Sequence, residues 1–178
     1  MNRKALLIGS PGNKGSDSYL GGVARDIQNY DRYLRSAAGG SWYASEIQTL
    51  EYPTTSEVRQ AIRPLESADY SFVLFSGHGY YDAKRNSTIA CLCRDDEIDS
   101  SELRKGCTRH TLVLDCCRVV ERHVLAEDTI AKADQAPRKL DAAECRYYFD
   151  KQVLSSPRGL IVLHACAIDE TAGDDMRC

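Results

Sequence analysis

The sequence predicts an α/β domain whose sheet is mainly parallel. Short apolar runs rich in branched side chains alternate along the chain with segments of helical period, which is typical of this class. The chain has 178 residues, the length of one domain, and its 43% hydrophobic and 28% charged content is typical of a globular protein. We therefore expect residues 1–178 to form a single domain.

The first third of the chain predicts two strands with a helix between them. We expect strands at residues 4–9 and 46–52, and a glycine-rich loop at residues 10–22. The helix that follows this loop has apolar residues at spacings of four, three and four, namely Val23, Ile27, Tyr30 and Leu34. One face of this helix should therefore pack on the sheet.

A second helix is expected directly after the second strand. Its inner face consists of Val58, Ile62 and Leu65. We expect Thr55 or Ser56 to cap its amino end, because a hydroxyl there accepts a hydrogen bond from a free backbone amide. Pro64 lies within the pattern and should bend or shorten the helix, because proline lacks the amide proton that a helix needs.

The rest of the chain predicts three further strands, at residues 70–76, 111–115 and 160–165. A polar loop with a short helix at residues 100–105 should separate the first two of these strands. Residues 119–137 are charged and lack a clear period, and we interpret them as a helix start followed by a mobile loop. Asp141 should cap a helix that leads into the last strand.

Two short motifs follow predicted strands directly. Ser-Gly-His-Gly occupies residues 76–79, and Asp-Cys-Cys-Arg occupies residues 115–118. Because ligands of open parallel sheets bind beyond the carboxyl ends of the strands, His78 and Cys117 should converge there if their strands are neighbours. A thiol beside an imidazole is a strong nucleophile at neutral pH. The motifs therefore predict covalent cysteine chemistry, and peptide hydrolysis in particular.

The residues around this pair predict the rest of a peptidase site. The backbone amides of Gly79 and Cys117 are candidates for an oxyanion hole. Side chains two residues apart on a strand share a face, so Ser76 should lie beside His78, and Asp115 beside Cys117. A carboxylate next to the nucleophile favours a cationic substrate side chain. We therefore expect cleavage after Arg or Lys.

The other candidate residues have weaker claims. Cys116 is the rival nucleophile, but strand alternation points it into the interior, where it should pack. His110 precedes the strand that carries the cysteine and should lie at its wrong end. His123 is expected on an exposed helix, and His164 inside the last strand as a core residue.

Composition argues against several other classes of function. Eight cysteines with no signal peptide favour free thiols in a reducing cytoplasm, so we expect a cytoplasmic protein. Cys91, Cys93 and Cys107 do not have a common zinc spacing, and we expect no metal site. A net charge of -3 gives no reason to expect nucleic acid, and the first apolar run, residues 5–8, is too short for a membrane. The glycines of the first loop do not form a phosphate-binding motif.

The His and Cys motifs, in this order on successive strands, resemble those of caspases and metacaspases. The segment Leu-Gly-Gly-Val-Ala-Arg-Asp at residues 20–26 resembles the metacaspase segment that supplies an acidic residue to the specificity pocket. The resemblance implies that Asp26 joins Asp115 and Ser76 in binding a basic side chain before the scissile bond. Residues 164–172 resemble a strand and loop that form another wall of the pocket.

This resemblance implies a three-layer α/β/α caspase-like fold with strand order 2-1-3-4-5. It implies a cysteine endopeptidase with a His-Cys dyad, and prokaryotic members suggest a role in regulated cell death or antiphage defence through activation of an effector such as a pore-forming protein. Many metacaspases need calcium, and an acidic cluster contains Asp95, Asp96, Glu97 and Asp99. No aspartate follows Cys117 until Asp128, so we expect no cofactor, and calcium activation stays open.

The family sheet has six strands, the last of them antiparallel, whereas this sequence predicts five. We therefore expect the final antiparallel strand to be missing and the chain to be a large-subunit-like portion, incomplete at its carboxyl end. Processing after Arg177, an artificial boundary at Cys178 or a separate partner chain would each explain this. A second subunit or carboxyl-terminal fragment should complete the fold, because an open edge strand is unstable alone. The alternatives are an inactive caspase-like scaffold and a redox- or metal-sensing domain.

Overall fold

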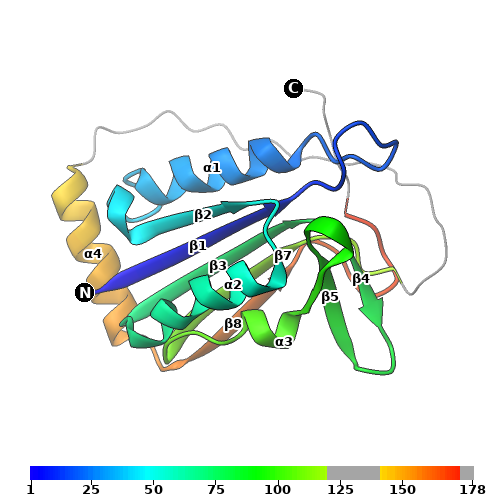
Figure 1. Ribbon diagram of the computed structural model, residues 1–178. Coiled ribbons are helices and arrows are strands. Elements are labelled where there is room, and N and C mark those ends of the chain that lie inside the picture. Colours follow the sequence, from blue (N-terminus) through cyan, green and yellow to red (C-terminus); the bar gives the residue numbers. More distant parts are fainter. Residues whose placement is uncertain (120–140, 173–178) are drawn as a thin grey trace.

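Five parallel strands form the main sheet, in the order β2-β1-β3-β7-β8 (Figure 1). This computed structural model describes residues 1–119 and 141–172. The strands are β1 (Arg3–Ser10), β2 (Ile47–Glu51), β3 (Tyr70–Gly77), β7 (Arg109–Asp115) and β8 (Gly159–His164). The predicted strand order 2-1-3-4-5 is confirmed, and the described residues add no antiparallel strand to this sheet.

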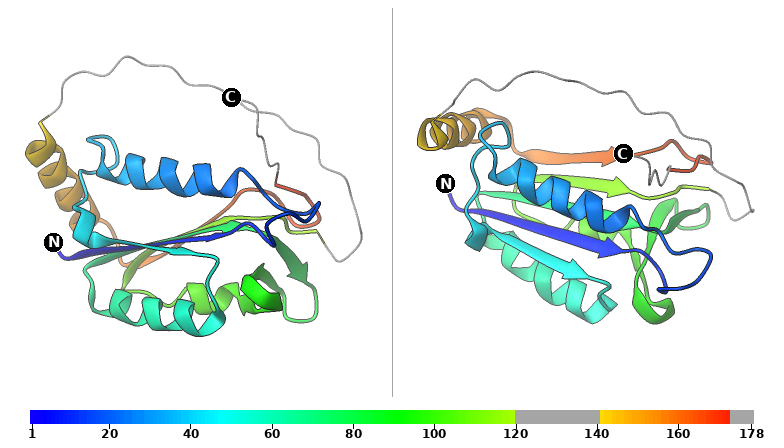
Figure 2. Two further views of the ribbon diagram at one scale, coloured as in Figure 1. Left: turned by 45° about the horizontal axis from the view of Figure 1, so that its top comes forward. Right: turned by 90° about the horizontal axis from the view of Figure 1, so that it is seen from above.

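Helices cover both faces of the sheet. The helix α1 (Val23–Arg35) lies over one face, and α2 (Thr55–Ile62) and α3 (Ser100–Leu103) lie over the other, as Figure 2 shows. The helix α4 (Ala142–Ser155) lies near the amino-terminal ends of the strands (Figure 1). The three layers that the resemblance implies are therefore present.

The core is divided by the sheet into two clusters. Leu6 and Ile8 of β1 face the α2 side, whereas Ala5 and Leu7 face the α1 side. This division follows from the alternation of side chains along a strand. Because β1 is buried on both faces, it reads in the sequence as an unbroken apolar run.

The segment between β3 and β7 differs from the sequence prediction. Instead of a polar loop, it forms a small antiparallel sheet of β4 (Gly79–Asp82), β5 (Ser87–Cys91) and β6 (Glu97–Asp99) before α3 begins. Its strands have four, five and three residues, which is too short for alternation to be recognised in a sequence. The sheet covers the carboxyl-end side of the core, where Ile89 and Ile98 are buried.

Short 3-10 segments complete the described structure: η1 (Ala44–Glu46), η2 (Arg63–Ser67) and η3 (Cys93–Asp95). The predicted effect of Pro64 is confirmed, because α2 ends before it and the chain continues as η2. The predicted cap at Thr55 or Ser56 is wrong by one residue. Thr54 caps α2 instead, because its side chain accepts from the Glu57 amide while the Glu57 carboxylate accepts from the Thr54 amide.

Several sequence expectations lie outside the described residues. They concern the helix start and loop expected up to residue 137, and the residues His123, Asp128, Arg177 and Cys178. Among the helices that the structure describes, none is long and apolar enough to cross a membrane.

A buried ion pair joins the first strand to the last helix. The Arg3 side chain is fully buried, and its Nη2 lies 2.8 Å from Oδ1 of Asp150 on α4. Arg3 also donates to the Gly40 carbonyl at 2.8 Å and lies over the rings of Trp42 and Phe149. A buried charge without its partner is costly, so this pair fixes α4 against the sheet.

Replacing Asp150 with alanine should lower the free energy of unfolding by about 3 kcal/mol or more, because the Arg3 charge stays buried without its carboxylate. The matched control is Asp31→Ala, which removes an exposed pair with Arg35 within α1 and should cost about 0.5 kcal/mol or less. Urea denaturation followed by circular dichroism measures both. Equal effects of the two variants would contradict the structural role assigned to Asp150.

Candidate active site

The two motifs lie side by side at the carboxyl edge of the sheet. Ser76 at the end of β3 is the register partner of Asp115 at the end of β7. A Cβ atom added to Gly79 would lie 2.8 Å from the Cys116 sulfur, so the chain just after His78 runs against the Cys116–Cys117 segment. The structure thus brings the His and Cys motifs together, as the sequence predicts.

A backbone carbonyl orients the imidazole of His78. Its Nε2 lies 2.5 Å from the carbonyl oxygen of Ser18, in the loop between β1 and α1. A carbonyl can only accept, so Nε2 carries the proton and Nδ1 is left as the basic nitrogen. This contact could not be predicted from the sequence, because Ser18 contributes its main chain and not its side chain.

Two glycines of the same loop adopt positive φ angles, 87° at Gly12 and 92° at Gly15. A Cβ atom on Gly12 would lie 3.2 Å from Cδ2 and Nε2 of His78, whereas one on Gly15 would meet nothing within 4 Å. Only Gly12 is therefore needed for the loop to approach the imidazole closely.

The segment after β8 lies against the cysteine motif. The half-buried Cys117 has its sulfur 3.7 Å from the Ala172 carbonyl oxygen. The backbone amide of Arg118 donates to the Glu170 carbonyl at 2.9 Å, and Nε of the Arg118 side chain donates to Thr88 Oγ1 at 3.1 Å. Residues 164–172 thus adjoin the cysteine, where the resemblance places a pocket wall.

An acidic group lies beside the two motifs on the α1 side of the sheet. The Ser76 hydroxyl donates to Oδ2 of Asp26 at 2.9 Å, and Asp115 is the strand neighbour of Ser76. Burial raises the pKa of Asp115, and the negative charge of Asp26 raises it further. The three residues named from the sequence for a basic side chain therefore form one cluster, which we call the acidic site.

Cys116 and His164 take no part in this arrangement. Cys116 is 1% exposed within the core, as alternation predicts, and burial is the main cause that raises its pKa well above the usual range of a thiol. The prediction that His164 is a core residue is wrong. It ends the edge strand β8 and is only half-buried, and burial followed by the charge of Arg118 lowers its pKa.

A second His-Cys pair lies at the opposite end of the sheet. Ser71 Oγ lies 2.7 Å from His110 Nδ1 and 3.2 Å from the Cys107 sulfur, and His110 Nε2 bonds the Leu103 carbonyl. Burial lowers the pKa of His110, which is 3% exposed, while Cys107 is 9% exposed. Both ring nitrogens have protein partners and both side chains are nearly buried, so we interpret this pair as structural.

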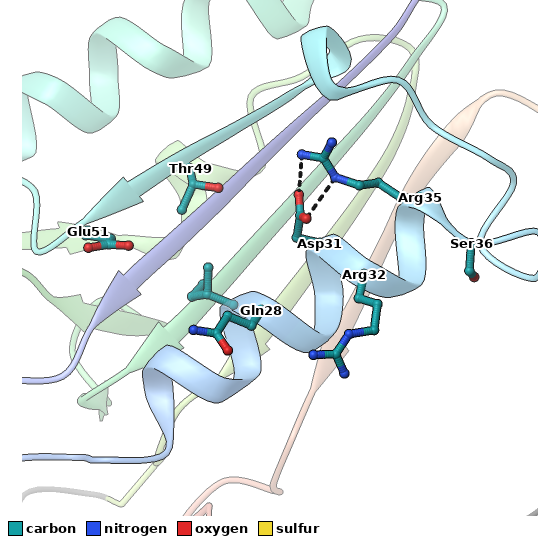
Figure 3. A pocket seen from close by; sticks show the side chains of 8 residues that line it. Gln28, Asp31, Arg32, Arg35, Ser36, Thr49 and Glu51 are labelled. Atoms are coloured by element: carbon teal, nitrogen blue, oxygen red, sulfur yellow. Dashed lines mark hydrogen bonds and ion pairs between the residues drawn. The ribbon is translucent and has the colours of Figure 1, made fainter.

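One of two described cavities lies away from the two motifs, and the other includes His78. One of about 790 Å³ lies between α1 and β2, away from His78 and Cys117, and Figure 3 shows the Asp31–Arg35 pair in its lining. Another of about 320 Å³ includes His78 and the carboxylates of Asp95, Asp96 and Glu97 in its lining.

Two of these carboxylates have protein partners. The Thr55 amide donates to Asp96 and the Tyr80 hydroxyl donates to Glu97. In residues 1–119 and 141–172, no group of three or more His, Cys, Asp or Glu side chains is placed to hold a metal ion.

Comparison with known proteins identifies the family. No curated protein matches the chain. The structure is similar to protein GSU0716 from Geobacter sulfurreducens, with 21% identity and a TM-score of 0.50 over 66% of this chain and 51% of that one. It is also similar to caspase-1 from Spodoptera frugiperda, with 11% identity and a TM-score of 0.55 over 96% of this chain and 61% of that one.

The chain thus spans about half to three-fifths of the length of these two structures, and at such identities the likeness shows the fold alone. The family model described as "Caspase domain" matches residues 2–177, which is nearly the whole chain. The chain therefore belongs to the caspase family of cysteine peptidase domains.

Proposed function

We propose that the protein is a cysteine endopeptidase in which Cys117 is the nucleophile and His78 the general base, and that it cleaves proteins after Arg or Lys. The observation that carries this proposal is the convergence of three features at one sheet edge. They are the oriented imidazole, a half-buried thiol and the acidic site. Family membership supports the reaction, and the two neighbouring carboxylates support the specificity.

The reaction that we propose begins with acylation. Nδ1 of His78 takes the proton of the Cys117 thiol, and the thiolate attacks the carbonyl carbon of the scissile peptide bond. The amides of Gly79 and Cys117 are our candidates to stabilise the oxyanion that forms. The imidazolium then gives its proton to the leaving amine, and a thioester with Cys117 remains.

Deacylation uses the same imidazole, with water in place of the thiol as the proton donor. His78 takes a proton from water, and the resulting hydroxide attacks the thioester carbonyl. The carboxylic acid product then leaves, and the imidazolium returns its proton to the Cys117 sulfur. The Ser18 carbonyl accepts from Nε2 throughout, so it keeps the ring in one orientation and stabilises the imidazolium. This makes Ser18 a positioning residue.

The acidic site explains the choice of substrate. Two partly buried carboxylates close together repel each other, and a cationic side chain between them relieves this repulsion. An acidic side chain there would add a third negative charge. Specificity for Arg or Lys therefore follows from the same electrostatics that raise the pKa of Asp115.

We further propose that a second subunit or a carboxyl-terminal fragment covers the free edge of β8. Within residues 1–119 and 141–172 this strand pairs only with β7, and three of its apolar residues are about half exposed, namely Leu160, Ile161 and Leu163. An exposed apolar edge strand is a pairing surface.

From family membership we also propose a role in regulated cell death or antiphage defence, through cleavage of an effector such as a pore-forming protein.

Fluorogenic peptides that differ only in the residue before the scissile bond test the reaction. We expect the wild type to cleave Arg and Lys peptides and not Asp peptides, and Cys117→Ala to lower kcat/KM by about 1000-fold or more. The control is Cys107→Ser, which changes the other His-Cys pair and should leave kcat/KM within about twofold, since Cys107 does not touch substrate. Preference for Asp, or activity that depends on Cys107 and not on Cys117, would refute the proposal. Failure of Cys117 to react with a thiol-directed alkylating probe would favour an inactive scaffold.

The loop that holds His78 can be tested with paired glycine variants. Gly12→Ala should lower kcat about tenfold or more, because its Cβ atom pushes on the imidazole that Ser18 orients. Gly15→Ala has the same backbone strain without the contact and should keep kcat near the wild-type value. Thermal melts show whether the two variants are equally stable. Equal losses of activity would mean that backbone strain, and not the contact with His78, is responsible.

The acidic site predicts a pH effect on substrate binding. Asp115 becomes neutral as the pH falls through its raised pKa, so the affinity of a Cys117→Ala variant for an arginine peptide should weaken as the pH is lowered. Asp26→Asn in the same background removes the charge that raises this pKa, while the amide oxygen can still accept from Ser76. The pH midpoint of binding, measured by calorimetry, should therefore move to lower pH. An unchanged midpoint would show that Asp115 does not control binding.

A further inference from the structure

Tyr30 lies at the inner end of the acidic site. It is one helical turn after Asp26 on α1, so the two side chains share a face of the helix. Asp26 contacts Ser76 of β3, whereas the Tyr30 ring packs on Phe72 of the same strand, with centroids 6.1 Å apart. Phe72 and Ser76 point to one face of β3, four residues apart. Since Phe72 is further from the carboxyl edge, Tyr30 lies deeper along the sheet than Asp26.

The Tyr30 hydroxyl interacts electrostatically with both carboxylates of the acidic site. Burial raises the pKa of Tyr30, and the charges of Asp115 and then Asp26 raise it further. The side chain is therefore a neutral phenol near neutral pH. It presents an oxygen that both donates and accepts, and an aromatic face, beside two carboxylates on different elements.

We propose that Tyr30 is a specificity-determining residue that makes the acidic site select arginine over lysine. This inference rests on the proposed function, because it concerns the same substrate site. It adds a residue that neither the sequence motifs nor the charges of the site single out, and it replaces a general preference for basic side chains by an order between them.

The selectivity follows from the shapes of the two cations. A guanidinium is planar, has five N–H donors and stacks on aromatic faces, whereas an ammonium is a compact and strongly hydrated charge with three donors. Asp26, Asp115 and Ser76 supply acceptors near the carboxyl edge of the sheet, and Tyr30 adds an acceptor and a ring further from that edge. An arginine side chain can use all of these groups, whereas a lysine ammonium is satisfied by the carboxylates alone.

Two peptide substrates that differ only in having Arg or Lys directly before the scissile bond test this proposal. The measured quantity is the ratio of kcat/KM for the Arg peptide to that for the Lys peptide. Tyr30→Leu should lower this ratio about tenfold, and Tyr30→Phe by a smaller factor, because phenylalanine keeps the ring and loses the oxygen. The control is Tyr33→Phe, an exposed tyrosine of the same helix, which should leave the ratio unchanged. Thermal melts of each variant report on folding separately.

The outcomes separate this proposal from the proposed function. Equal losses for Arg and Lys peptides in Tyr30→Leu would show a structural role and overturn the proposal, although the peptidase activity would stand. If the wild type cleaves neither peptide, the proposed function fails, and the selectivity is then read from binding. In that case calorimetry compares Arg and Lys peptides on Cys117→Ala and on Cys117→Ala/Tyr30→Leu. A preference for Arg that falls in the double variant supports the role of Tyr30, whereas equal affinities, or no binding of either peptide, overturn it.

Discussion

The register between β3 and β7 is the constraint on which the candidate site depends. Six consecutive residue pairs, from Ser71 with His110 to Ser76 with Asp115, bring both strands to the same edge. A slip of one residue would turn Asp115 to the α2 face and put the neighbouring side chains of the motif on the wrong sides. The slip is prevented by the core, because Leu112 and Leu114 are fully buried on the α2 side while Val113 packs on the α1 side. Apolar packing along the strand therefore fixes which of the two adjacent cysteines leaves the core.

The acidic site holds two like charges close together, which is electrostatically unfavourable. Asp26 and Asp115 come from different elements and raise the cost of ionising each other, as the raised pKa of Asp115 indicates. The Ser76 hydroxyl offsets part of this cost by donating to Asp26. Such a group is poorly suited to stabilising the fold, in contrast to the buried Arg3–Asp150 pair, where opposite charges meet. Under the proposed specificity, the repulsion between the two carboxylates is relieved when a cationic side chain binds, so that binding energy and specificity would have one physical origin.

Features that are encoded by side chains close in sequence could be predicted, whereas features that depend on the main chain or on tertiary packing could not. The strands β1, β3 and β7 were predictable because buried parallel strands are apolar on both faces, and the chemistry of the residues after β3 and β7 is the basis of the candidate site. Ser18 could not be found in this way, because any residue can offer its carbonyl. The helical period of the sequence assigns Tyr30 to an apolar face of a helix, and only the packing of α1 on β3 brings it near Asp115. The strands of the small sheet were missed because they are too short to show a period.

The two edges of the sheet differ in a way that bears on Cys117, the proposed nucleophile. The edge strand β2 exposes polar side chains such as Thr49 and Glu51, which discourage pairing with another strand, whereas β8 exposes mainly aliphatic ones. The chain leaves β8 directly into the segment whose carbonyls contact Cys117 and the Arg118 amide. Any contact that orders β8 therefore also acts on the position of the thiol. Because this short segment connects the apolar edge to Cys117, a strand added at β8 would affect the position of the Cys117 thiol, whereas one added at β2 would have to act across the whole sheet.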